Sequence, residues 1–201
     1  MKKWLSIGLL ALGLSLFGHG AYMQAKAWLA QVLIEQAWQT ALKSPNKKIK
    51  PWFYADSYPV AQIIWPKHNK RLTVLDGASG RNLAFAPSHF LPSGELGGAD
   101  FGNSQGALIA GHNDTHFAFL KNAKVGEQFF LQLKNGQVQH YSVTHVEVIH
   151  QHNTDFLQQS GLYLLTCYPC DSLASGTDLR WLVSAEISSP EVELGISTTS
   201  S

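Results

Sequence analysis

The sequence predicts an all-β domain, built as one closed barrel or sandwich, behind a single N-terminal membrane helix. Three observations support this prediction. The 201 residues suffice for one domain of ordinary size and are too few for two large ones. An apolar stretch of membrane-spanning length opens the chain. Beyond residue 55, short apolar runs alternate with Gly, Pro, Asn and Asp.

The N-terminal stretch 4–23 is almost entirely apolar and follows two lysines. Twenty helical residues span roughly 30 Å, the thickness of the bilayer's hydrocarbon core. A cleaved signal peptide also begins in this way, but it needs a small-x-small cleavage site. The best candidate for that site, Ala25-Lys26-Ala27, carries a charge at its centre. We therefore expect residues 1–24 to form an uncleaved anchor, with cleavage as the alternative.

Residues 25–54 are predicted to form an amphipathic stalk and a linker. Apolar residues recur at helical spacing, namely Leu29, Val32, Leu33, Ala37, Trp38 and Ala41. Ser44-Pro45 ends the helix, because the residue before a proline is pushed out of helical geometry. The basic run Lys47–Lys50 fits either contact with lipid phosphates or a solvated linker.

The domain 55–189 has the pattern of short strands separated by turns. The candidate strands are Val60–Trp65, Leu72–Leu75, Leu83–Ala86, Gly106–Ala110, Gln128–Leu133, His140–Val148, Leu162–Thr166 and Leu179–Ala185. Asn135-Gly136 predicts a hairpin between two of them, since both residues tolerate positive φ. No long amphipathic helix interrupts the series, so a βαβ sheet is disfavoured. Residues 190–201 end in Ser-Thr-Thr-Ser-Ser and read as a disordered tail.

Composition and charge exclude several classes of protein. Apolar residues make up 45% of the chain and charged residues 14%, against an average of roughly 25% charged. A disordered or nucleic-acid-coating protein needs denser charge, so no nucleic-acid partner is expected. The net charge of +1 hides an asymmetry, because residues 1–50 carry seven Lys and one Glu. Two cysteines cannot form a disulfide scaffold or a four-cysteine zinc site.

Three side chains with chemical potential each stand at the end of a predicted strand. Cys167 follows the run Leu162–Thr166, and a thiolate nucleophile needs a partner that lowers its pKa and protonates a leaving group. His112 ends the run Gly106–Gly111 and could be that partner. Arg180 opens the last strand and could stabilise an oxyanion. A buried cysteine and a surface ion pair of Arg180 are the plainer interpretations.

These segments resemble the three motifs of sortases, the cysteine transpeptidases of bacterial surfaces. The motifs stand here as Ala110-Gly111-His112, Leu164–Cys167 and Leu179–Val183, in the same order and at similar separation. Gly102-Asn103 and Asp114–Phe117 also follow the sortase pattern. The resemblance covers nearly all of the predicted β domain. The single N-terminal span and the Cys-Tyr-Pro turn look most like the Gram-negative subgroup.

The resemblance implies a closed eight-stranded β-barrel and a role for each side chain. Cys167 would attack the carbonyl carbon of a Thr-like residue in an LPxTG-type sorting signal and form a thioester. His112 would protonate the departing amine and deprotonate the incoming one. Arg180 would hold the oxyanion or the substrate backbone. Thr166 and Asp114 would contact the substrate.

The partners implied are a substrate protein with an LPxTG-like C-terminal signal and an amine acceptor on the cell envelope. The lysines before the apolar stretch favour an N-inside orientation. We therefore expect a single-pass protein of the inner membrane whose catalytic domain is periplasmic. No cofactor and no metal are expected, and the sequence offers no acidic cluster that argues for calcium.

Three alternatives come from other classes. Cys167-Tyr168-Pro169-Cys170 has the C-x-P-C pattern of a thiol-disulfide oxidoreductase, or of a redox brake on the nucleophile. His112 and His116 have the spacing of two zinc ligands, but the zinc protease motif needs Glu where Asn113 stands. A non-catalytic, membrane-tethered β domain would leave the three motifs unexplained.

Overall fold

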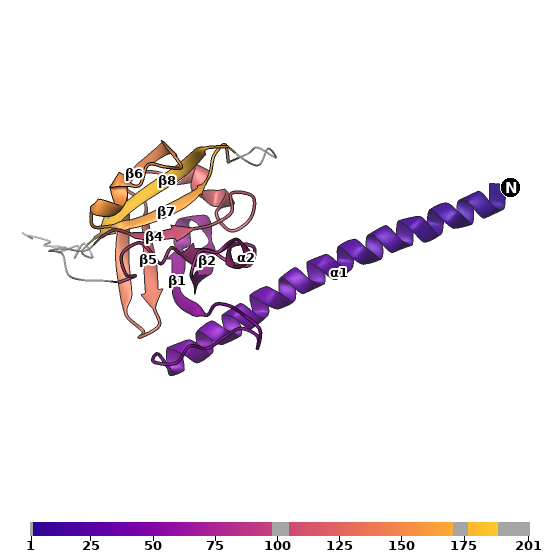
Figure 1. Ribbon diagram of the computed structural model, residues 1–201, viewed down its shortest axis with the longest axis horizontal. Coiled ribbons are helices and arrows are strands. Elements are labelled where there is room, and N and C mark those ends of the chain that lie inside the picture. Colours follow the sequence, from indigo (N-terminus) through magenta and orange to yellow (C-terminus); the bar gives the residue numbers. More distant parts are fainter. Residues whose placement is uncertain (1, 98–104, 171–176, 189–201) are drawn as a thin grey trace, which may run out of the picture.

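The computed structural model describes residues 2–97, 105–170 and 177–188 (Figure 1). Gly102-Asn103 and the predicted tail 190–201 lie outside these residues. One long helix, α1 (Lys2–Lys43), precedes a small β-barrel. The first half of α1 projects away from the barrel, and the second half lies along its β1–β2 side (Figure 1).

The strands of the described residues close into an eight-stranded barrel. They are β1 (Pro59–Trp65), β2 (Lys70–Asp76), β3 (Ser88–His89), β4 (Ala107–Ala110), β5 (Gln128–Leu133), β6 (Val138–His150), β7 (Leu162–Cys167) and β8 (Leu179–Ile187). Their order around the barrel is β1-β2-β3-β4-β7-β8-β6-β5, and β5 pairs with β1 to close it. The β2–β3 and β4–β7 pairs are parallel, and the others are antiparallel. The predicted all-β fold and the barrel that the resemblance implied are confirmed.

Seven of the eight predicted strands match observed strands, and Leu83–Ala86 does not. This segment begins in the short helix α2 (Gly80–Leu83) and continues as a turn. The Ser79 hydroxyl caps α2 by accepting a hydrogen bond from the Asn82 amide. The backbone amides of Phe85 and Ala86 then donate to the Asn82 carbonyl, which closes the turn. The strand at this place, β3, begins only after Pro87.

Short 3-10 helices lie in three further connections: η1 (Pro66–His68), η2 (Ala118–Asn122) and η3 (Asp155–Gln158). The β5–β6 hairpin turns at Asn135-Gly136 as the sequence predicts, with Gly136 at φ +87°. The Asn135 side chain accepts a hydrogen bond from the Gln137 amide at 3.0 Å.

Aromatic rings fill the middle of the barrel. Trp65 stacks on Phe129 with ring centroids 4.5 Å apart, and Phe129 stacks on Tyr141 at 5.6 Å. Burial raises the pKa of Tyr141 to about 12, and its hydroxyl donates to Gln139 at 2.9 Å. This column joins β1, β5 and β6, so it fixes the side of the barrel away from β4 and β7.

The second half of α1 packs on the barrel through one apolar stripe. Its buried members are Ala30, Ile34, Ala37, Trp38 and Ala41, which recur every three or four residues. Beside the stripe, Glu35 accepts hydrogen bonds from Gln62 of β1 and Thr73 of β2, both at 3.1 Å. Gln31 donates to the Phe85 carbonyl oxygen at 2.6 Å. The predicted stalk is therefore helical, and its amphipathic face covers β1 and β2.

The first half of α1 has no such cover. α1 is the one helix of the described residues that is long and apolar enough to cross a membrane, with a mean hydropathy of 1.3 over its most apolar window. Its large side chains there, including Trp4 and Phe17, are exposed. The anchor interpretation of residues 1–24 is consistent with this geometry.

Candidate active site

The candidate site forms where β4 and β7 end and β8 begins. β4 and β7 run parallel with Ala110 opposite Leu165, and the Gly111 amide donates to the Leu165 carbonyl at 3.0 Å. Parallel strands keep their register, so the chain leaving β4 brings His112 beside Cys167. Both side chains are exposed to solvent.

The register of β7 and β8 brings the third predicted side chain to the same place. Cys167 is directly opposite Arg180 in this antiparallel pair. Side chains of directly opposed residues project from the same face, with Cβ atoms roughly 5 Å apart. The two segments are separated by a dozen residues in sequence, and only their pairing makes them neighbours.

Alternation along the strands sets which face of the barrel carries the site. Leu162, Leu164 and Thr166 of β7 face the interior, where the first two belong to the main core. Tyr163 and Leu165 face outward and pack in a second apolar cluster with Leu108, Ile149 and Leu182. Cys167 continues this outer series. The thiol therefore stands on the outer face of the barrel, at the open end of the second cluster.

The Arg180 guanidinium is held by three acceptors. It donates to the carbonyl oxygens of Thr177 at 2.6 Å and of Leu179 at 2.8 Å. It also donates to Gln151 Oε1 at 2.7 Å, and Gln151 in turn donates to Asp178 Oδ1 at 2.7 Å. These bonds fix the orientation of the guanidinium. Among the described residues all three acceptors are neutral, and Asp178 bonds to Gln151 and not to Arg180. Asp171, the other possible ion-pair partner, lies outside the described residues.

Two further contacts shape the turn that follows Cys167. Asn113, next to His112, donates to the Pro169 carbonyl oxygen at 3.1 Å. Tyr168 stacks on Trp181 with centroids 5.8 Å apart, and the Trp181 indole donates to the Leu120 carbonyl oxygen at 3.0 Å. The segments carrying His112 and Cys167 are thus joined beyond the ends of their strands as well as along them.

Thr166 is buried, and its hydroxyl donates to the Gly111 carbonyl oxygen at 2.7 Å. This bond ties β7 to the residue that precedes His112. The substrate contact predicted for Thr166 stays a prediction, and what the structure gives this side chain is a bond that positions the site. Gly111 is tightly enclosed, because a Cβ there would lie 2.7 Å from the Phe117 ring.

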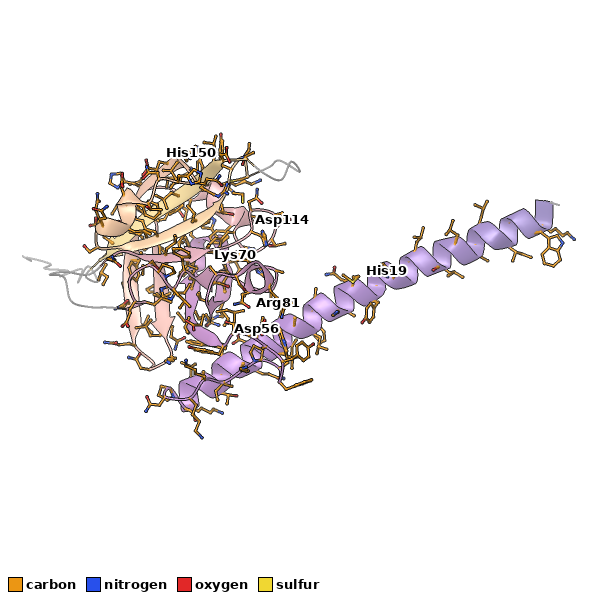
Figure 2. The ribbon with its side chains drawn as sticks, in the orientation of Figure 1. His19, Asp56, Lys70, Arg81, Asp114 and His150 are labelled. Atoms are coloured by element: carbon orange, nitrogen blue, oxygen red, sulfur yellow. The ribbon has the colours of Figure 1, made fainter. Side chains whose placement is uncertain are left out.

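The loop after His112 carries two more polar side chains. Asp114 is exposed at the edge of the barrel (Figure 2), and its role with substrate stays a prediction. His116 is partly buried, and burial followed by the neighbouring His112 lowers the pKa of His116, against smaller opposing effects of the Phe85 backbone and Asp114. His116 is therefore neutral near pH 7.

The geometry does not favour the rival sites named from the sequence. Residues 113–117 form a turn, whereas a zinc protease motif needs both histidines on one helix. Within the described residues, no three His, Cys, Asp or Glu side chains cluster as a metal site would. Cys167 ends a strand, whereas the first cysteine of a thiol-disulfide oxidoreductase motif opens a helix.

Sequence reasoning missed the residues that support the site. Gln151 follows β6, far from every motif, and nothing in the sequence marks it as a partner of Arg180. Trp181 and Asn113 stand next to predicted site residues, and that adjacency was the available signal. Their roles depend on side-chain directions, which the strand pattern alone does not give.

Comparison with known proteins identifies the family. A model of the Sortase domain matches residues 63–188, well over half of the chain. A search among curated proteins finds no match. The chain therefore belongs to the sortase family. Sortases are cysteine transpeptidases, and this protein is an enzyme of that class.

Solved sortase structures share the fold. Sortase A of Corynebacterium diphtheriae aligns with a TM-score of 0.57 at 19% identity, covering 82% of this chain and 86% of that one. A sortase D5 transpeptidase of Clostridium perfringens aligns with a TM-score of 0.59 at 16% identity, covering 80% and 96%. Sortase C-1 of Streptococcus pneumoniae aligns with a TM-score of 0.56 at 26% identity, covering 65% and 67%.

Proposed function

We propose that this sortase cleaves an LPxTG-type C-terminal sorting signal through a thioester on Cys167 and transfers the protein to an amine. The observation that carries the proposal is the arrangement of three strand ends, where Cys167 is exposed, Arg180 is its register partner and His112 leaves the adjacent strand. A thiol, an acid–base group and an oxyanion donor are the parts that acyl transfer requires.

In the first half of the reaction the Cys167 sulfur attacks the carbonyl carbon of the Thr residue of the signal. The C–N bond to the next residue breaks, and His112 gives its proton to the departing amine. In the second half an amine attacks the thioester carbonyl and loses a proton to His112. The C–S bond breaks, and Cys167 is restored with no net change.

Arg180 is assigned the oxygen that becomes negative in both halves. A guanidinium has five N–H donors, so its bonds to Thr177, Leu179 and Gln151 leave capacity for a substrate oxygen. Because those three bonds hold the group before substrate arrives, little reorganisation is needed when the charge develops. Thr166 and Asp114 complete the proposal as substrate contacts.

The proposed location is the inner membrane, with α1 as a single-pass anchor and the barrel in the periplasm. The length and hydropathy of α1 support the anchor, and the lysines before the apolar stretch support the orientation. Assignment to the Gram-negative subgroup belongs to this proposal as well.

The test is to incubate the full chain in detergent with an LPxTG peptide and candidate amines, and to analyse the products by mass spectrometry. A suitable peptide comes from a neighbouring reading frame that ends in an LPxTG-like motif, an apolar span and a basic tail. The expected product joins the fragment ending in Thr to the amine. Hydrolysis in the presence of every amine would make the enzyme a peptidase instead. Cleavage by the Cys167→Ala variant would refute the mechanism.

A further inference from the structure

An exposed group of aromatic side chains stands where the barrel meets α1. Trp52, Phe53 and Tyr54, here called the aromatic loop, precede β1. Phe53 is 91% exposed and Tyr54 is 65% exposed, although their rings contact each other at 4.8 Å. Trp52 packs edge-on against Phe85 at 5.1 Å. The loop is thus anchored to the barrel at one ring and presents two rings to the outside.

The aromatic loop lies against a particular part of α1. A groove of about 370 Å³ is lined by Trp52 and Tyr54 on one side and by Lys26, Leu29 and Leu33 on the other. The apolar stretch of the proposed anchor ends at Met23, so this groove begins just beyond it. In Figure 1 the connection between α1 and β1 crosses α1 where the helix leaves the barrel. Figure 2 labels Asp56 and Arg81 in this part of the molecule.

The same region of α1 has the composition of a membrane–water boundary. Tyr22 is exposed, and the spacing of residues 22, 26, 29 and 33 places it on the face that lines the groove. Trp28 is exposed on the other side of the helix. Trp and Tyr concentrate at the headgroup level of bilayers, and Lys side chains extend from helix ends toward that level.

We propose that the aromatic loop is a second membrane contact, which inserts Phe53 and Tyr54 among lipid headgroups beside the emerging α1. The inference rests on the proposed anchoring of α1. A lipid surface is the partner that fits, because the groove places the aromatic loop beside α1 just beyond the proposed membrane span. Lys26, which lines the groove, adds positive charge that anionic lipids attract.

Two contacts would do what one helix cannot. Because the second half of α1 packs on the barrel, helix and barrel move as one unit. A single span leaves this unit free to tilt in the bilayer, whereas the helix and the loop together restrict the tilt. Since Trp52 and Phe85 tie the loop to the segment before β3, the orientation passes to the barrel itself. The open ends of β4, β7 and β8 are then held at a defined angle to the bilayer.

The test is photo-crosslinking of the full chain in vesicles of phosphatidylglycerol and phosphatidylethanolamine. p-Benzoylphenylalanine replaces Phe53 in one variant and Phe17, in the apolar half of α1, in a second. A third carries it at Val138, an exposed position of the β5–β6 hairpin that is 45% accessible. All three side chains are exposed, so the substitutions leave the packed core intact. Lipid adducts are then counted by mass spectrometry after irradiation.

We expect adducts at position 17 and at position 53, with about tenfold more at 53 than at 138. Adducts at 17 but no more at 53 than at 138 would overturn the second contact and leave the anchor standing. If position 17 gave no adducts, the anchor would fail, and with it the second contact.

Discussion

Polar side chains differ in exposure between two walls of the barrel. One wall is formed by β4, β7 and β8, and the other by β1 and β2. On the first wall, Cys167 and His112 stand exposed at strand ends, and Arg180 is held in place beside them. On the second, Glu35 of α1 is bonded to Gln62 and Thr73 beneath the helix. Polar side chains at a strand therefore indicate a reactive site only where the fold leaves them exposed to solvent.

The walls also differ in what covers them. The buried stripe of α1 closes the β1–β2 wall, so its polar network contributes to stability. The outer face of β4, β7 and β8 carries an apolar cluster that stops short of Cys167. We therefore expect substitutions on the β4, β7 and β8 wall to change reaction rates. Substitutions on the β1–β2 wall should change the free energy of unfolding.

The largest effects are expected from His112→Ala and Arg180→Ala. Under the proposed mechanism each removes a group that acts in the transition state, so each should lower kcat/KM for peptide cleavage by at least about 10²-fold. Arg81→Ala is the matched control, because Arg81 forms an exposed ion pair with Asp56 away from the site. Near-wild-type kinetics for either site variant would remove that residue from the machinery.

Trp38→Ala probes the other wall. The Trp38 side chain is fully buried under the second half of α1, so its loss should cost about 3–5 kcal/mol of unfolding free energy. The rate per folded molecule should stay unchanged. Denaturant unfolding of the full chain in detergent measures the first quantity, and Trp28→Ala is the exposed control. A Trp38→Ala variant that unfolds like the wild type but has lost its cleavage rate would contradict the separation of stability and activity between the two walls.

The rate and stability predictions above concern strands and a helix that the sequence alone predicts. The contacts between these elements could not be predicted from the sequence. Seven strands and the helix follow from local patterns of apolar residues and turns. Barrel closure depends on pairings between distant strands, such as β5 with β1, and the residue pattern alone left a sandwich open. Leu83–Ala86 was mistaken for a strand because its apolar composition outweighed the cap that Ser79 provides.

The site shows the same division. Cys167, His112 and Arg180 could be named because each follows or opens an apolar run and matches a family motif. Their neighbourhood could not be derived, since it depends on the register of β7 with β4 and β8. Gln151 and the helix contact of Glu35 were missed because both act through long-range side-chain contacts.

A smaller effect is expected from Glu127→Gln, at the residue just before β5. Burial alone would raise the pKa of Glu127, but the ion pair with Lys67 and the hydrogen bond with His68 outweigh it and lower that pKa below its usual 4.5. A depressed folded-state pKa adds stability above the unfolded-state value, and this stability is lost as pH falls through the folded-state pKa. Glu127→Gln should cost about 1–3 kcal/mol at pH 7.

The cost should shrink as the pH falls through the lowered pKa of Glu127, where the wild-type carboxyl group takes up its proton. Thermal unfolding of both proteins across this range measures it. A difference that stays constant with pH would show that the side-chain shape matters and the charge does not.

We expect Cys167, and not Cys170, to carry the acyl group. Intact-mass analysis of the full chain, quenched in acid after mixing with an LPxTG peptide and no amine, tests it directly. The account predicts a thioester adduct that maps to Cys167, is cleared by hydroxylamine, persists in Cys170→Ser and is absent from Cys167→Ala. An adduct on Cys170, or an adduct that survives in Cys167→Ala, would contradict it.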